Sequence, residues 1–287
     1  MERRVVTVRG IVQGVGFRPY VYRLARQCQL RGSVRNDSGA VHIEIEGDTR
    51  SLDRFCRELA NRPPPMAAIR KVSSAVLRCR GDVDFRIVES AAGHSLDIFV
   101  SPDVATCPDC LRELFDPADR RYRYPFLNCT DCGPRLTIVR GAPYDRRLTT
   151  MAPFTLCSAC RAEYESPLDR RYHAQTTCCP RCGPRLQLLT SRGEPIETND
   201  RVGTFGDELR AAKIGALKGL GGYHLVCDAT NATAVARLRQ RKERDDKPLA
   251  IMVASIEHAE SLCDVTSAER ELLVSPARPI VLLRRKK

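Results

Sequence analysis

The chain has 287 residues, of which 43% are hydrophobic and 29% are charged, as in ordinary globular domains and unlike a disordered chain. Lysine and arginine number 47 against 35 aspartate and glutamate, a net charge of +12, which favours anionic partners without choosing among phosphate esters, nucleotides and nucleic acid. No apolar run is long enough to cross a bilayer, and the first residues do not form a secretory signal. We therefore expect a cytoplasmic protein with no membrane partner.

The first 90 residues contain no CxxC pair and alternate strand and helix patterns. Residues 36–39, Asn-Asp-Ser-Gly, separate two strand-like runs and are typical of a β-hairpin turn. The predicted order is β-α-β-β-α-β, which is the split βαβ arrangement of ferredoxin-like domains. Strands are predicted over residues 4–9, 33–35, 41–46, 69–77 and 84–88, and helices over 17–29 and 52–60.

A glycine-rich segment lies between the first predicted strand and the first predicted helix. Glycines allow backbone N–H groups to turn inward, and the start of the helix adds positive potential, so the segment can hold an anion. Arg18 falls on the first helical turn, where its guanidinium can grip two phosphate oxygens. A plain turn with a surface arginine is the other interpretation of this segment taken alone. The candidate loop residues are Gln13, Gly14, Val15, Gly16 and Phe17.

The string VQGVGFR at residues 12–18, together with Val-Arg-Asn at 34–36 and the turn at Gly39, resembles the acylphosphatase signature. The resemblance covers residues 3 to about 90. It implies that Arg18 and the loop amides bind the phosphate, and that Asn36 positions the water that attacks phosphorus. No general base is evident, which suits a reaction driven by positioning and by electrostatic stabilisation of a labile acyl phosphate.

Eight of the fourteen cysteines form four CxxC pairs, a pattern that indicates metal binding in a cytosolic chain. A shift of 50 residues maps the first two pairs onto the last two, so residues 101–190 contain an internal duplication. Each copy is CxxC-x18-CxxC, within the spacing of four-cysteine zinc sites, and we expect two zinc ions. The predicted ligands are Cys107, Cys110, Cys129, Cys132, Cys157, Cys160, Cys179 and Cys182.

Several features of this module have alternative interpretations. The four pairs can combine in three ways, of which pairing within each copy is the simplest, and an iron–sulfur cluster is the less favoured metal group. Cys178 is off the repeat and is interpreted as a bystander, whereas His173 is a polar loop residue or a fifth ligand. Six arginines could bind nucleic acid, but most stand beside aspartates, which favours structural ion pairs and a scaffolding role. They are Arg120, Arg121, Arg135, Arg170, Arg171 and Arg185.

From residue 200 the chain returns to α/β character, with strands predicted over 214–217, 249–253 and 280–283 and helices over 232–241 and 267–273. A glycine-rich stretch at 218–222 and a KxR…PL stretch at 242–249 together resemble the YrdC-type nucleotide-binding domain. The resemblance implies that Lys242 and Arg244, with Lys247 and Lys218, contact the triphosphate of ATP. Residues 200–287 are expected to be an incomplete domain of this type.

The whole is predicted to be an α+β multidomain chain: an acylphosphatase-like domain (1–90), the tandem finger module (101–190) and the partial YrdC-like domain (200–287). That order resembles the N-terminal portion of the HypF family of carbamoyltransferases. The resemblance implies hydrolysis of carbamoyl phosphate, formation of carbamoyl adenylate with ATP, and transfer to the C-terminal cysteine of a HypE-type protein in [NiFe] hydrogenase maturation. This chain is expected to perform only the hydrolase step. The alternatives are a zinc-ribbon nucleic-acid-binding protein and a stand-alone acylphosphatase with appended domains.

Overall fold

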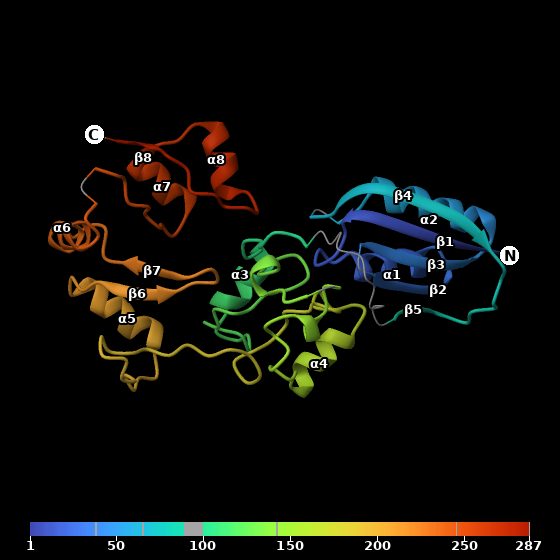
Figure 1. The fold of residues 1–287 in the computed structure, drawn as a ribbon, viewed down its shortest axis with the longest axis horizontal. Helices are drawn as coiled ribbons and strands as arrows, with labels where there is room; N and C mark the ends of the chain where they lie inside the picture. Colours follow the sequence, from blue (N-terminus) through green and yellow to red (C-terminus); the bar gives the residue numbers. More distant parts are fainter. Residues whose placement is uncertain (38, 65, 89–99, 142, 245, 287) are drawn as a thin grey trace. The chain divides into compact units, whose positions relative to one another are not determined.

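The computed structural model describes residues 1–37, 39–64, 66–88, 100–141, 143–244 and 246–286 (Figure 1). The chain divides into two compact units, Met1–Pro184 and Arg185–Lys287. The first unit contains a five-stranded sheet and the cysteine-rich module, and the second contains two small sheets with helices. Among the described residues, no helix is long and apolar enough to span a membrane.

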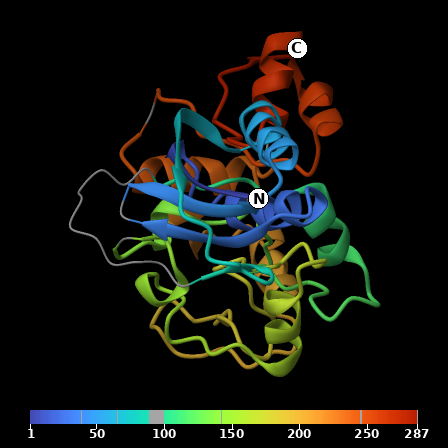
Figure 2. The ribbon, with the colours of Figure 1, turned by 90° about the vertical axis from the view of Figure 1, so that its right-hand side faces the viewer.

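The first unit begins with a sheet whose strand order is β4-β1-β3-β2-β5. Neighbouring strands are antiparallel except β2 and β5, which are parallel. The strands lie side by side in blue and cyan in Figures 1 and 2. The predicted βαββαβ order is confirmed, and β5 follows it at the strand predicted over 84–88, whereas Ser38 of the predicted turn lies outside the described residues. The elements are β1 (Glu2–Ile11), α1 (Phe17–Gln27), β2 (Arg31–Asp37), β3 (Ala40–Gly47), α2 (Thr49–Asn61), β4 (Ala68–Leu77) and β5 (Phe85–Ile87).

The core of this sheet domain lies between the strands and the two helices. Alternate residues of β1, Val6 and Val8, are buried against apolar side chains of α1 and α2, as the two-residue period of a strand requires. Helix α2 buries Leu52, Phe55 and Leu59, which share one face because of the 3.6-residue helical turn. Full burial of a side chain of this size stabilises the fold by about 1.5–3 kcal/mol. The domain therefore holds its loops on a rigid support.

The rest of the first unit has little regular structure, as the sequence predicted. Helices α3 (Pro108–Phe115) and α4 (Ser158–Glu165) each begin directly after the first cysteine of a CxxC pair. Two single-turn 3-10 helices, η1 (Leu136–Ile138) and η2 (Arg146–Leu148), lie between the two copies. A small apolar cluster that includes cysteines is the only core found in the described part of this module, so metal sites are needed as additional cross-links.

The second unit contains two two-stranded sheets, β6–β7 and β8–β9. Its predicted strand at 214–217 and its predicted helices at 232–241 and 267–273 are confirmed. The elements are α5 (Arg201–Arg210), β6 (Gly215–Lys218), β7 (Tyr223–Val226), α6 (Ala232–Arg241), α7 (Ile256–Leu262), β8 (Cys263–Asp264), α8 (Ser267–Val274) and β9 (Arg284–Arg285).

Two predicted strands of this unit, at residues 249–253 and 280–283, are wrong. Both stretches lack regular structure, and large apolar side chains such as Met252 and Ile280 are exposed there. A strand is defined by a hydrogen-bonded neighbour, and in the described part of the unit neither stretch has one. The β-forming composition of the two runs is therefore not sufficient to make them strands.

Candidate active site and metal centres

The predicted anion-binding loop connects β1 to α1. Gly14 and Gly16 have φ values of 72° and 70°, in the left-handed region that side chains disfavour, and Gly16 caps the start of α1. A Cβ on Gly14 would lie 3.2 Å from the side chain of Arg135, and one on Gly16 would lie 3.3 Å from that of Thr130. The glycines thus serve two purposes, because they allow the turn and also let the finger module approach the loop closely.

Arg18 and Asn36 meet at this loop, although they lie on different elements. Arg18 is in the first turn of α1 and is 8% exposed, and Asn36 is in β2 and is 1% exposed. Both line a cavity of about 30 Å³ next to the loop. The Oδ1 atom of Asn36 is buried and has no hydrogen-bond partner among the described residues. A buried acceptor left unpaired costs about 1–3 kcal/mol, so this atom is suited to a donor such as a water molecule.

The other predicted loop residues are also near the cavity, but three of their side chains support the loop. The Nε2 atom of Gln13 donates to the carbonyl oxygen of Asp37 at 2.7 Å. Val15 and Phe17 are buried in the hydrophobic core of the sheet domain. The side chains of Gln13, Val15 and Phe17 are therefore used inside the protein, where they support the loop.

Finger residues line the same cavity, and sequence reasoning missed this. Thr130, Arg135, Tyr144 and residues 173–176 come from the cysteine-rich module. His173 is outside both cysteine clusters, so the structure places it at the cavity and not as a fifth ligand. Burial, and after it the charge of Arg18, lower the pKa of His173 to about 4, against an opposing effect of Asp145. The one signal in the sequence is that His173 replaces the Arg123 of the other copy.

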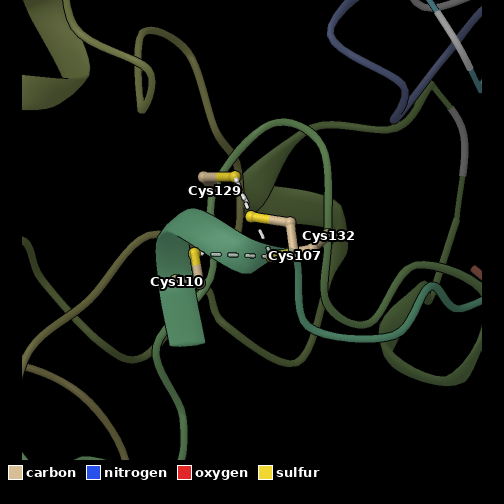
Figure 3. Close-up of side chains that lie close together, drawn as sticks. All are labelled: Cys107, Cys110, Cys129 and Cys132. Atoms are coloured by element: carbon tan, nitrogen blue, oxygen red, sulfur yellow. Dashed lines mark hydrogen bonds between the residues drawn. The ribbon is translucent and has the colours of Figure 1, made fainter. Parts of the chain in front are cut away.

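The predicted cysteine ligands gather into two clusters, one in each copy. In the first, Sγ–Sγ distances are 3.7 Å for Cys107–Cys129, 3.8 Å for Cys129–Cys132 and 3.5 Å for Cys132–Cys110. Figure 3 shows these four sulfurs close together. Four thiolates about 2.3 Å from a tetrahedral zinc ion would lie about 3.8 Å apart, so the cluster fits such an ion.

The second cluster has the same form, and the two clusters together show which CxxC pairs share a site. Its Sγ–Sγ distances are 3.7 Å for Cys157–Cys179 and 3.8 Å for Cys179–Cys182. Within each cluster the four sulfurs all lie within 4.8 Å of one another. Pairing within each copy, the simplest of the three arrangements, is confirmed.

Each finger contributes arginines to the cluster of the other finger. Arg170 of the second copy donates to the Sγ atom of Cys110 at 3.1 Å and pairs with Glu113 at 2.6 Å. Arg171 pairs with the same glutamate and donates to the carbonyl of Asn128 at 3.1 Å. A guanidinium next to a metal-binding thiolate offsets the negative charge of a four-cysteine site.

The reverse contacts follow the same 50-residue shift. Arg120 of the first copy donates to the Sγ atom of Cys160 at 3.3 Å, and both Arg120 and Arg121 pair with Glu163. Burial opposes ionisation of this glutamate, but hydrogen bonds from Arg121 and Arg120 outweigh it and hold the pKa of Glu163 at about 2. The expected structural ion pairs are present, but their partners are glutamates of the opposite finger. Neighbouring aspartates instead accept from main-chain N–H groups, as Asp119 does at 2.7 Å.

Two further predictions about the module concern Arg135 and Cys178. Arg135 is buried and donates to the carbonyl oxygens of Cys132 and Thr130 at 2.7 and 2.8 Å, so its charge is used inside the protein. Cys178 is buried outside both clusters, as expected of a bystander, with its sulfur 3.5 Å from the hydroxyl of Tyr124. Of the six arginines considered for nucleic-acid binding, Arg120 and Arg185 are exposed, and Arg120 is paired with Glu163.

The predicted nucleotide-binding residues lie in the second unit. Lys218 ends β6, and its ammonium is 5.0 Å from the ring centroid of Tyr223. Lys242 is exposed at the C-cap of α6. Arg244 donates to the carbonyl of Pro248 at 3.3 Å, and the carbonyl of Lys247 accepts from Arg239 at 3.0 Å. These contacts join Arg244 to Pro248 and Lys247 to α6.

Three family models match the chain. The acylphosphatase model matches residues 4–87, and the model described as HypF finger matches residues 106–139 and 156–189. The model described as telomere recombination, which covers Sua5, YciO and YrdC proteins, matches residues 207–287. The acylphosphatase of Thermotoga maritima is 42% identical over 88 residues, which are 30% of this chain and 97% of that protein.

Relatives that match nearly the whole chain have all three regions in common with it. Carbamoyltransferase HypF2 of Cupriavidus necator is 53% identical over 98% of this chain and 35% of its own length. Carbamoyltransferase HypF of Rhizobium leguminosarum is 52% identical over 99% of this chain and 35% of its own length. The crystal structure of a full-length HypF in a phosphate- and nucleotide-bound form matches with a TM-score of 0.93 and 42% identity, over 99% of this chain and 37% of that one. The crystal structure of T. kodakarensis HypF matches with a TM-score of 0.90 and 44% identity, over 100% of this chain and 36% of that one.

The chain thus spans about a third of the length of the HypF proteins that it matches. The similarity extends over the sheet domain, both fingers and the region after them, and the order of these regions is the one that the sequence predicted. It supports neither a nucleic-acid-binding zinc-ribbon protein nor a stand-alone acylphosphatase. The chain belongs to the HypF family.

Proposed function

We propose that this chain hydrolyses carbamoyl phosphate at the Arg18–Asn36 site, as one step of the carbamoyltransferase activity for which its relatives are named. The observation that carries the proposal is the buried Oδ1 atom of Asn36, which has no partner among the described residues, beside a buried arginine and a glycine-rich loop. A cation and main-chain amides suit the phosphoryl group, and a lone acceptor suits a water molecule. The acylphosphatase match over residues 4–87 supports the same chemistry.

In the proposed reaction, the guanidinium of Arg18 and the loop amides donate to the phosphoryl oxygens and orient the phosphorus. The amide oxygen of Asn36 accepts a hydrogen bond from the attacking water. Water attacks phosphorus, the bond between phosphorus and the bridging oxygen breaks, and carbamate leaves with that oxygen while inorganic phosphate takes the water oxygen. Because carbamate is a good leaving group, positioning and charge stabilisation suffice without a strong base.

Arg18→Ala and Asn36→Ala variants test this assignment. Arg18→Ala should weaken acyl-phosphate binding and turnover, whereas Asn36→Ala should mainly lower turnover, each by about 100- to 1,000-fold in rate. Arg23→Ala and Asn61→Ala are matched controls, because both residues are exposed on the helices of the same domain. Phosphate release from carbamoyl phosphate is the measurement. Turnover at the wild-type rate in both site variants, with folding unchanged, would contradict the assignment.

The two cysteine clusters hold two zinc ions in this proposal, one in each finger. The sulfur spacing and the match to the HypF finger support it. The protein's thiolates would fix the ions, and zinc would supply a redox-inert tetrahedral cross-link for the module. Metal analysis should give about two zinc ions per chain. A value below one, or the visible absorption of an iron–sulfur cluster, would contradict this part.

The later steps concern the whole family protein. Carbamate would react with ATP to give carbamoyl adenylate and pyrophosphate, with Lys218, Lys242, Arg244 and Lys247 contacting the triphosphate. The carbamoyl group would then go to the C-terminal cysteine of a HypE-type partner for [NiFe] hydrogenase maturation. The proposed division is an acylphosphatase-like domain (1–90), a finger module (101–190) and a partial YrdC-like domain (200–287). The proposed compartment is the cytoplasm, where thiolate metal sites are common.

Pyrophosphate release separates the hydrolase step from this second step. With saturating ATP and carbamoyl phosphate, this chain should release phosphate but little pyrophosphate. Robust pyrophosphate formation would mean that the nucleotide site is complete within these residues. If pyrophosphate does form, alanine at Lys242 or Arg244 should reduce it and leave phosphate release unchanged.

A further inference from the structure

We infer that residues 144–146, between the two fingers, form a third part of the acyl-phosphate site, in which Asp145 is a positioning residue for Arg18. The inference rests on the proposed hydrolase function and adds to it a group from outside the acylphosphatase-like domain. It also gives a role to the Pro-Tyr-Asp-Arg sequence at residues 143–146, which neither the metal sites nor the loop explains. Three independent sets of contacts support it.

Tyr144 attaches this segment to the loop. Its main-chain N–H donates to the Oε1 atom of Gln13 at 3.2 Å, and its ring would lie 3.3 Å from a Cβ on Gly14. The tyrosine is buried, and its hydroxyl donates to the carbonyl of Pro134 at 3.4 Å. Gln13 also donates to the carbonyl of Asp37, next to Asn36. One glutamine therefore links the loop, the strand that carries Asn36 and the finger segment.

Arg146 anchors the other end of the segment in the second finger. Its Nη1 atom donates to the carbonyl oxygens of Gln175 and Thr177 at 2.7 and 2.9 Å, and its Nη2 atom donates to that of Phe154 at 2.7 Å. Burial lowers the pKa of Arg146. Three main-chain acceptors around one buried guanidinium leave the segment little freedom, so the residue before Arg146 is held at a fixed place.

Asp145, which lies between these two anchors, reaches Arg18. Its Oδ1 atom is 2.9 Å from the Nη2 atom of Arg18, and the two side chains are 15% and 9% exposed. An arginine side chain loses up to about 2 kcal/mol of conformational entropy when it is ordered. A fixed carboxylate supplies that order before the substrate arrives. A guanidinium has five N–H donors, so contact with one carboxylate oxygen is compatible with phosphate binding.

The comparison with shorter relatives indicates that this contact is an addition to the basic domain. The Thermotoga maritima acylphosphatase aligns over 97% of its length with 88 residues of this chain. Its alignment therefore has no room for a counterpart of Asp145, which lies well beyond the acylphosphatase match at 4–87. In this chain the finger module supplies the contact, which makes the site dependent on the module.

Variants of Asp145 in the full chain test the inference. Asp145→Asn keeps the shape and one acceptor for Arg18, whereas Asp145→Ala removes the contact, and Asp145→Glu moves the carboxylate by one methylene. We expect the alanine and glutamate variants to lower kcat/KM for carbamoyl phosphate by about 10- to 100-fold, and the asparagine variant to stay within about threefold of wild type. Asp109→Ala is the control, since Asp109 is an exposed acid of the same module.

A second readout uses inorganic phosphate as the probe and needs no turnover. Phosphate should protect wild type and Asp145→Asn against thermal unfolding, and should protect Asp145→Ala and Asp145→Glu less. Four results would overturn the inference: wild-type values in all three variants, equal loss in all three, loss of zinc as the cause of the change, or tighter phosphate binding in both the alanine and the asparagine variant. The last would make Asp145 a competitor of phosphate. If wild type binds phosphate at Arg18 but hydrolyses no acyl phosphate, the proposed function fails while the positioning role is still decided by binding.

Discussion

The two fingers arise from one repeated sequence, and their comparison separates what the metal sites require from what the catalytic site requires. The main chain is nearly the same in both. Arg123 and His173 occupy equivalent positions with φ of 56° and 53°, in the left-handed region. Their N–H groups donate to the carbonyls of Leu114 and Tyr164, which are also equivalent, at 2.8 and 2.9 Å. The duplication has therefore preserved an uncommon backbone conformation while the side chain has changed.

The side chains diverge where the second finger meets the acylphosphatase-like domain. Tyr122 of the first finger is 43% exposed, whereas its equivalent, Tyr172, is 6% exposed and meets the ring of Tyr22 in α1 at a centroid distance of 5.4 Å. Residues 173–176 line the cavity, but in the first finger the equivalent positions 124 and 126 pack in the module's own core. The cysteines and their arginines are thus common to both copies. Both copies reach the cavity, the first through Thr130 and Arg135, but among the described residues the stretch 173–176 lines it without its equivalents 123–126.

The largest expected effect tests the part that the fingers share. Cys110→Ser and Cys160→Ser each remove a metal ligand and the sulfur that accepts from an arginine of the other finger. Because each finger helps to neutralise the other's cluster, either variant should lose more than one zinc ion per chain and unfold the module around residues 101–184. Structural zinc sites contribute about 10 kcal/mol or more of binding free energy to folding. Metal analysis and circular dichroism are the measurements, and loss of one ion with the other finger intact would contradict the coupling.

Arg170→Met separates coupling from simple ligand loss, because it leaves all eight cysteines in place. It should weaken metal binding in the first finger, opposite to its own, by about 10- to 100-fold. Arg120→Met should do the same to the second finger. Cadmium NMR, with one resonance for each site, identifies the affected finger during chelator competition. Arg161→Met, at an exposed position of α4, is the control, and weakening in the arginine's own finger would show that the contacts have been misassigned.

A smaller effect is expected from the residue at which the fingers differ most clearly, His173. Its pKa of about 4 is below the ordinary value of 6.5, so the unfolded chain takes up a proton in this interval and the folded chain does not. The stabilising contribution is complete above pH 6.5 and falls as the pH decreases toward 4. Between pH 6.5 and 5 the expected loss is about 1–2 kcal/mol. The charged and titratable groups around the ring are Arg18, Asp145, Tyr164 and Tyr172.

His173→Gln should make the free energy of unfolding less dependent on pH over this range. The difference between variant and wild type isolates the histidine, since the zinc-binding thiolates and all carboxylates titrate in both proteins. Denaturant unfolding at pH 6.5 and at pH 5 provides the measurement. Arg123→Gln, at the equivalent exposed position, should leave the pH dependence unchanged. Parallel pH profiles of His173→Gln and wild type would mean that the imidazole is not kept neutral by burial.

The sequence predicted those features that depend on local spacing. The four-cysteine spacing led to the correct clusters, and alternation of apolar residues led to the correct order of strands in the first 90 residues. It could not show that His173 lies near Arg18, because no local pattern reports a contact between residues so far apart in the chain. For the same reason the sequence favours ion pairs with adjacent aspartates such as Asp119, whereas the arginines pair with Glu113 and Glu163 of the opposite fingers. The two wrong strands of the second unit are a further case, because apolar composition does not specify a hydrogen-bonded neighbour.

The smallest expected effect concerns the aromatic contact that distinguishes the second finger. Tyr172→Ala removes a buried ring that meets both Tyr22 and His173 edge-on, at centroid distances of 5.4 and 4.6 Å. An aromatic pair of this kind contributes about 0.5–1.5 kcal/mol beyond its buried area. Tyr122→Ala, at the exposed equivalent position, removes no ring contact with any described residue and should change stability by less than about 0.5 kcal/mol.

A double-mutant cycle with Tyr22→Ala measures the pair itself, because the cost of emptying either position alone is subtracted. The coupling between Tyr22 and Tyr172 should be about 1 kcal/mol, and that between Tyr22 and Tyr122 should be zero within error. Since the ring of Tyr172 also supports His173 at the cavity wall, Tyr172→Ala should raise KM for carbamoyl phosphate modestly while both zinc ions remain bound. Equal effects of the two tyrosine substitutions would show that the fingers do not differ in their contact with the acylphosphatase-like domain, and that divergence of the second copy has another cause.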